Sequence, residues 1–204
     1  MYKRQIDGNG EIDGNDRQFI GSPHPDFTYG INLNAEYKGF DFSVFFQGSQ
    51  GNDIYNLTRV FTETSLFDGA KSLAYVNAWT PDNTSASVPA LTTVAADNSL
   101  ERQTSSRFIE DGSYLRLKNI VLGYTIPVAF TERYNINRLR VYLQARNLIT
   151  FTDYSGLDPE ISVRSFSNQQ DTEDIRSNNV RSLGVDTGTY PISRSVLMGV
   201  NLTF

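Results

Sequence analysis

The chain has 204 residues, of which 39% are hydrophobic and 12% aromatic, and its formal net charge is −5 at pH 7. An acidic chain lacks the positive field that holds a phosphate backbone, so nucleic acid is not an expected partner. The sequence contains no Cys and no run of the roughly 18 apolar residues that a membrane-spanning helix needs. Its 13 Phe and 11 Tyr favour β-strands and membrane interfaces.

The N-terminal segment can be aligned with the calcium-binding loop of an EF-hand. Asp7, Asn9 and Asp16 fall on ligand positions of that template, and the carbonyl of Glu11 falls on another. However, Gln5 replaces the usual first Asp, and Asp16 is shorter than the usual bidentate Glu. The segment is therefore either a Ca²⁺ site or an Asn/Gly-rich surface turn.

Five segments alternate apolar and polar residues with a period of two, which predicts β-strands. These segments are residues 27–37, 40–48, 114–125, 138–150 and 195–204. The Lys38-Gly39 pair predicts a tight hairpin turn between the first two strands. The third strand has mixed faces, and a β-bulge near Lys118-Asn119 would place its apolar residues on one side.

The connections between these strands differ greatly in length. After the short hairpin turn they run to about 60 residues, with a helix-like patch at 57–76, then about a dozen, then about 40. Such long connections are unusual in a compact domain but typical of a transmembrane β-barrel, which has short turns on one rim and long loops on the other. Apolar side chains would face lipid, and polar ones would face the lumen.

Five strands cannot close a barrel, and lipid leaves no backbone edge unpaired. We therefore expect an all-β fold that is the C-terminal part of a larger antiparallel barrel. The start of the chain also lacks the apolar core of a signal peptide, so we expect the export signal to lie upstream. The alternative is a soluble all-β glycan-binding or adhesion module with long loops.

Short motifs spread over nearly the whole chain resemble the C-terminal end of the SusC/RagA family of TonB-dependent outer-membrane transporters. They include GSPHPDFTYG at 21–30, DGSYLRLKN at 111–119 and DYSGLDPE at 153–160. The others lie at residues 37–41, 46–48, 122–124, 145–148 and 190–191, and the chain finishes on Phe204. Any one of these motifs is weak, but their order along the chain makes the resemblance specific.

The resemblance implies a barrel of about 22 strands with an N-terminal plug in the outer membrane of a Gram-negative bacterium. It implies import of oligosaccharides or peptides with a SusD-like surface lipoprotein, driven by TonB through the absent N-terminal region. Residues 1–26 would form an extracellular loop and residues 27–204 the barrel, surrounded by outer-membrane lipid. Phe204 resembles the signal read by the barrel assembly machinery. The fragment alone would transport nothing.

Other side chains are candidates for ligand-binding or catalytic sites. Tyr55, Tyr75 and Trp79 lie in the longest connection and would either stack on sugar rings or hold the loop together. Asp153, Asp158 and Glu160 suggest a carboxylate pair of the glycosidase kind, but carboxylates in a loop after a strand are usually solvated. An enzyme is therefore not expected, and no cofactor is expected apart from the Ca²⁺ considered above.

Overall fold

The computed structural model describes residues 8–10, 14–64, 69–90, 104–161 and 183–204. The chain divides into two compact units. The sheet unit comprises His24–Asn52, Asp111–Glu160 and Tyr190–Phe204, and the loop unit comprises Met1–Pro23, Asp53–Glu110 and Ile161–Thr189. This division differs from the boundary expected at residue 26, because the long connections cluster with the N-terminal segment. Within the described residues, no helix has the length and apolar character to cross a membrane.

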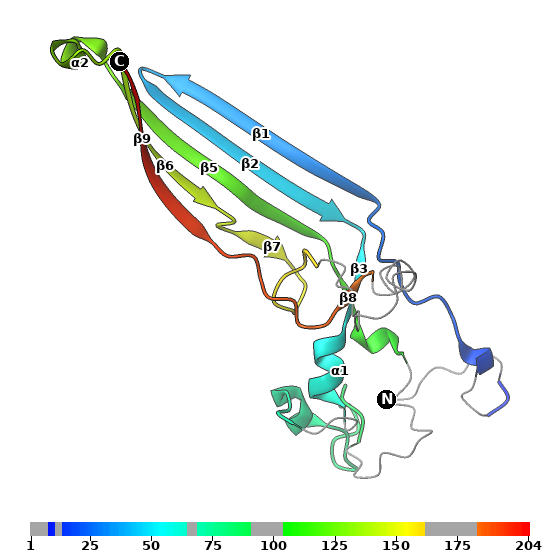
Figure 1. Cartoon of the computed structure of the whole chain (residues 1–204). Coiled ribbons are helices and arrows are strands. Elements are labelled where there is room, and N and C mark those ends of the chain that lie inside the picture. The colour runs from blue at the N-terminus through cyan, green and yellow to red at the C-terminus, as the bar shows by residue number, and fades with distance from the viewer. Residues whose placement is uncertain (1–7, 11–13, 65–68, 91–103, 162–182) are drawn as a thin grey trace, which may run out of the picture. The chain divides into compact units, whose positions relative to one another are not determined.

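The sheet unit is built on five long antiparallel strands, as predicted. They are β1 (Phe27–Tyr37), β2 (Phe40–Gln50), β5 (Tyr114–Ile126), β6 (Arg138–Arg146) and β9 (Ser195–Thr203). The strands lie side by side in the order β1-β2-β5-β6-β9 (Figure 1). Among the described residues, β1 and β9 each pair on one side only, so both edges of the sheet are open.

The turn between β1 and β2 has the geometry that a two-residue hairpin requires. Lys38 and Gly39 have φ angles of 47° and 86°, and positive φ at both central residues gives a turn whose twist matches that of the strands. The register then runs without interruption from Tyr37 opposite Phe40 to Phe27 opposite Gln50. β2 is therefore two residues longer than the predicted 40–48.

The bulge predicted in the third strand is confirmed. Phe45 pairs with Asn119 and Phe46 with Leu117, which leaves Lys118 as the extra residue of β5. An extra residue reverses the facing of everything beyond it. Leu117 therefore shares a face with the apolar residues on the far side of the bulge, while Val121 lies on the polar face.

One face of the sheet is apolar across all five strands. Its cross-strand rows include Tyr37-Phe40-Tyr124-Val141-Val200 and Ala35-Phe42-Leu122-Leu143-Met198. These side chains are not covered by the protein: Leu122 is 50% exposed, Val200 55% and Met198 84%. The other face carries polar rows such as Asn32-Phe45-Asn119-Arg146-Ser195. So large a continuous apolar surface is rare on proteins that are surrounded by water.

The prediction of one continuous strand over residues 138–150 is wrong. β6 ends at Arg146, and the separate strand β7 (Thr150–Thr152) lies against the start of β5. Between them Asn147 has a φ of 51°, and its backbone N–H donates to the Lys118 carbonyl at 3.1 Å. The bulge thus interrupts the ladder on both neighbours of β5, and Asn tolerates the left-handed conformation this requires.

The connector between β5 and β6 is short and partly helical. It contains α2 (Val128–Thr131) and the 3₁₀ turn η5 (Glu132–Tyr134), and it exposes Phe130 and Tyr134. Figure 1 shows α2, the hairpin turn and the C-terminus at the same end of the sheet. The short connections therefore share one rim.

The loop unit has a small sheet in the order β4-β3-β8, in which β3 (Asp53–Asn56) pairs in parallel with β8 (Val185–Asp186). β4 spans Ile109–Asp111. Asn56 begins α1 (Leu57–Glu63) by accepting a hydrogen bond from the Arg59 N–H. The helix-like patch expected at 57–76 is thus reduced to α1 and the 3₁₀ helix η2 (Leu73–Asn77) in the described residues. The remaining 3₁₀ turns are η1 (Gly14–Asp16) and η4 (Ser106–Phe108).

Candidate functional site

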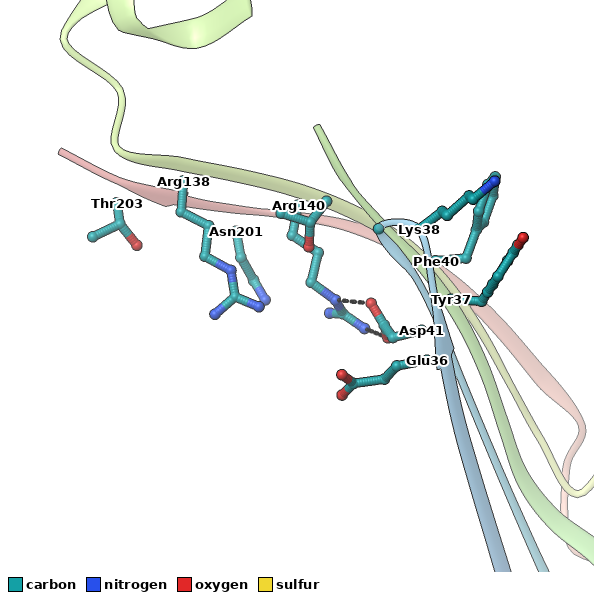
Figure 2. A pocket seen from close by; sticks show the side chains of 11 residues that line it. Glu36, Tyr37, Lys38, Phe40, Asp41, Arg138, Arg140, Asn201 and Thr203 are labelled. Atoms are coloured by element: carbon teal, nitrogen blue, oxygen red, sulfur yellow. Dashed lines mark hydrogen bonds and ion pairs between the residues drawn. The ribbon is translucent and has the colours of Figure 1, made fainter. Parts of the chain in front are cut away.

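The polar face of the sheet unit is hollowed beside the Lys38-Gly39 turn. A pocket of about 660 Å³ is lined there by side chains from all five long strands. Its polar lining residues are Glu36, Lys38, Asp41, Thr125, Arg138, Arg140, Asn201 and Thr203. Figure 2 shows that Glu36, Asp41, Arg138 and Arg140 point to one side of the sheet, whereas Tyr37 and Phe40 point to the other. We call this hollow the turn-end pocket.

An ion pair that bridges three strands crosses the turn-end pocket. Arg140 Nε donates to Asp41 Oδ1 at 2.8 Å, and Nη2 donates to Oδ2 (Figure 2). Gly123 lies on β5 directly opposite Asp41 and leaves the space for this contact. A Cβ at Gly123 would overlap both the carboxylate and the guanidinium. The Asp41–Arg140 ion pair therefore depends on the glycine at position 123.

Charges of both signs surround this ion pair. Glu36 is directly opposite Asp41 on the same face, and two carboxylates in that position repel one another. Arg140 compensates for one of them, and Arg138 adds a second guanidinium to the lining. The pocket thus has a lining of mixed charge, which suits contact with polar groups.

A second polar cluster lies on the same face beyond the bulge, and its Arg116 and Asp158 side chains are buried. Arg116 donates through Nε to Thr150 Oγ1 at 2.9 Å, through Nη1 to Glu160 Oε2 at 2.9 Å, and through Nη2 to Asp158 Oδ1. Lys118, the bulge residue, reaches both oxygens of Glu160 at 2.8 and 2.6 Å. Only 3% of Arg116 and of Asp158 is exposed. We call these five residues the Arg116 cluster.

The environment of Asp158 keeps its carboxyl group ionised. Burial raises the pKa of Asp158, but the Arg116 guanidinium and the backbone N–H groups of Ile192 and Glu160 outweigh that effect. The pKa therefore lies below its ordinary value of 3.8. The interpretation of Asp158 as a solvated loop carboxylate is wrong.

The Arg116 cluster could have been suspected from the sequence. Arg116 stands between Leu115 and Leu117 in a strand, at an inward position where a charge needs a partner. Nothing local identified Asp158 as that partner, because the two residues are 42 positions apart. This long-range pairing is what the sequence analysis missed.

The aromatic residues proposed as sugar-stacking groups are partly covered within the loop unit. Tyr55 packs edge-on against Phe108 with ring centroids 6.3 Å apart, and burial raises the pKa of its phenol. Lys71 Nζ lies 5.6 Å from the ring centre of Tyr75. The backbone N–H of Trp79 donates to the Val88 carbonyl at 2.9 Å. All three residues thus have contacts that hold the loop unit together.

The EF-hand-like segment is described only in part. Asp7 and Glu11 lie outside the described residues, whereas Asn9 and Asp16 lie within them. Gly10 has a φ of 91°, and Asp16 ends the 3₁₀ turn η1. In the described part of the chain, no cluster of three or more His, Cys, Asp or Glu side chains is placed to hold a metal ion.

Aromatic side chains gather at the end of the sheet that carries the turn. Phe40 and Tyr124 face each other on neighbouring strands with centroids 4.6 Å apart, and Tyr37 adjoins them with 70% of its surface exposed. Phe204, the proposed assembly signal, is 77% exposed just beyond β9. An aromatic band at a strand end is typical of a membrane interface.

These features define a class of protein. An antiparallel sheet with open edges, an uncovered apolar face and a charged opposite face is a segment of a β-barrel wall. The solved RagAB peptide transporter contains this architecture: it superposes on 95% of the chain with a TM-score of 0.72 and 30% sequence identity, over 19% of its own length.

Curated relatives extend the comparison. TonB-dependent receptor P3 of Formosa agariphila is 41% identical over 199 residues, which cover 98% of this chain and 18% of that protein. TonB-dependent receptor SusC of Bacteroides thetaiotaomicron is 30% identical over 203 residues, which cover 97% of this chain and 17% of that protein. No family model matches. The chain belongs to the SusC/RagA-type TonB-dependent receptors and spans about a fifth of their length, at the C-terminal end.

Proposed function

We propose that this chain forms part of the wall of an outer-membrane transporter that imports nutrients. The observation that supports this most strongly is the apolar face, which runs across all five strands and is left open to the surroundings. Burial of this face in lipid would gain the transfer free energy of each apolar side chain. Relatives of this type are outer-membrane proteins, which supports the same location for this chain.

The substrate and partners follow from the relatives rather than from a site in this chain. We propose import of peptides or oligosaccharides with a SusD-like surface lipoprotein, because one structural relative is a peptide transporter and one curated relative is SusC. TonB would act through the N-terminal region, and the barrel assembly machinery would recognise the terminal strand with Phe204. These roles involve binding and passage without a chemical step, so the proposal is not that of an enzyme.

The direction of the chain in the membrane follows from its connections. The Lys38-Gly39 turn and the α2 connector would lie at the periplasmic rim, and the long connections would lie outside the cell, as barrels arrange them. The turn-end pocket would then face the lumen near the periplasm. Because five strands leave both edges unpaired, the chain alone would not transport.

Membrane fractionation and uptake test this proposal. The full-length protein should be found in the outer-membrane fraction, should require detergent for extraction, and should support uptake of glycans or peptides that a deletion strain lacks. Recovery of the full-length protein in aqueous buffer without detergent would reject it. A gene for a SusD-like lipoprotein beside its own gene would support the proposed partner.

Two ligand sites remain predictions. We propose a Ca²⁺ ion at Asp7, Asn9, Glu11 and Asp16, a proposal that the positive φ of Gly10 supports because the sixth loop position of an EF-hand makes a sharp turn. Calorimetric titration of the full-length protein with Ca²⁺ tests this, and an absence of binding heat would reject it. We also propose that the half-buried rings of Tyr55, Tyr75 and Trp79 contact sugars. Replacement by Ala with unchanged uptake would reject this role.

A further inference from the structure

Two segments that are far apart in the sequence are tied together in the sheet unit. The Ile192 N–H donates to Asp158 Oδ2 at 3.0 Å across 34 positions of the chain. A second bond joins the same region, from the Asn147 side-chain amide to the Ser193 carbonyl at 3.3 Å. These bonded residues flank residues 161–189, which we call the excursion, on its two sides in the sequence.

The tie is centred on one carboxylate. Asp158 Oδ1 accepts the Glu160 N–H at 2.9 Å and also binds Arg116, while Oδ2 accepts Ile192. Arg116 comes from β5 and is itself held by Thr150 of β7. Both ends of the excursion are therefore bonded to the sheet through Asp158.

The ion pair and hydrogen bonds of Asp158 require one arrangement of the two segments that they join. Removing two charges from water costs free energy that their attraction often fails to recover, so a buried ion pair is a weak source of stability. It does demand one arrangement, because each oxygen and each N–H must find its partner. Only 3% of the Arg116 side chain and 4% of the Asp158 side chain is exposed, so water cannot substitute for these partners.

We propose that Arg116 and Asp158 are positioning residues that clamp the two stems of the 161–189 excursion at a fixed separation. The two stems then form a rigid base within the sheet unit. The further step, that this base orients an extracellular loop for substrate capture, rests on the proposed transport function.

Distances between spin labels test the clamp directly. Leu157 and Tyr190 flank it, are 68% and 81% exposed, and belong to a segment without Cys, so labels can be placed at Leu157→Cys and Tyr190→Cys of the full-length protein in detergent. The clamp predicts a narrow distance distribution in the parent protein. A broad distribution there would overturn the proposal without any further substitution.

Substitution of the clamp gives the second test. Asp158→Asn places an amide N–H₂ among three donors, and it should broaden the distribution about twofold or more, since local order depends on these contacts. Arg116→Lys keeps the charge but loses the forked contact, and it should broaden the distribution less. The Arg116→Lys variant also tests the proposal if the Asp158→Asn variant does not fold. Unchanged distributions in folded variants would overturn the proposal.

A matched control separates the clamp from general damage. Asp41→Asn removes an ion pair of the same type at the other end of the sheet and should leave the Leu157–Tyr190 distribution unchanged.

Uptake by the same variants tests the step that rests on the transport function, the orientation of a loop for substrate capture. Asp158→Asn is expected to lose more uptake than Asp41→Asn. If the parent protein shows no uptake, the transport function fails while the distance result still decides on the clamp.

Discussion

At the scale of single residues, Gly123 controls the ion pair in the turn-end pocket. Gly123→Ala should push Asp41 and Arg140 apart and lower the free energy of unfolding by about 1 kcal/mol or less, because partly exposed ion pairs contribute little. Urea titration of the full-length protein in detergent measures this change. In an Asp41→Asn background the same substitution should cost less, and equal costs in both backgrounds would show that the ion pair is not the cause.

Asp158 makes the stability of the folded protein depend on pH. Because its pKa in the folded protein is lower than the ordinary 3.8, its ionised form contributes stability that is fully present above that value. This contribution should fall as the pH drops through the lowered folded pKa. Melting temperatures recorded from neutral pH down to about pH 3 should therefore decline less steeply in Asp158→Asn than in the parent protein. Parallel declines would contradict the assignment.

At the scale of elements, the β5 bulge sets the facing of the apolar residues. Deletion of Lys118 should move Leu115 and Leu117 to the polar face, because removal of one residue from a strand reverses every side chain beyond it. We expect a sharp loss of folded protein in the outer membrane, measured by the heat-dependent shift in gel mobility. Lys118→Ala keeps the residue count and should assemble far better. Equal assembly of the two variants would show that the bulge is dispensable.

β9 offers a matched pair of neighbours that lie on opposite faces. Val200→Arg places a charge on the apolar face, in the same cross-strand row as Phe40 and Tyr124 of the aromatic band, and should cost up to about 1 kcal/mol, as expected near a membrane interface. Asn201→Arg places the same charge on the polar face beside the turn-end pocket and should cost little. The denaturant midpoints of the two variants in lipid bilayers measure the difference. Similar costs would argue against lipid on the Val200 side.

Much of the sheet could be predicted from the sequence, because strand faces obey a period of two. β1 matches the predicted 27–37, and the mixed pattern of 114–125 was enough to locate the bulge. The break after Arg146 was missed, because it depends on the extra residue of a neighbouring strand. The short strands β3, β4 and β8 were missed as well, since pieces of two to four residues carry no periodicity.

The candidate sites, like the sheet, could be predicted only where the signal is local in the sequence. The alternation predicted which polar residues face the lumen side, including Glu36 and Arg146. It could not predict that Asp41 and Arg140 bond across Gly123, or that Asp158 is buried against Arg116, because these contacts join residues 99 and 42 positions apart. Long-range ion pairs have no local signature.

At the scale of the whole molecule, the account depends on what surrounds the sheet. The chain covers about a fifth of the length of its relatives, and both edge strands of the sheet are open among the described residues. Closure of the barrel would pair those edges, and lipid would cover the apolar face. Each strand would then have one face in hydrocarbon and one in water.

The most direct test of this claim is a scan of single spin labels along β9 of the full-length protein in lipid bilayers. Labels at Val196, Met198 and Val200 should be accessible to oxygen, which concentrates in lipid, and shielded from a water-soluble nickel reagent. Labels at Leu197 and Asn201 should show the reverse, in alternation along the strand. Equal access of the nickel reagent to both sets would contradict the membrane-spanning wall.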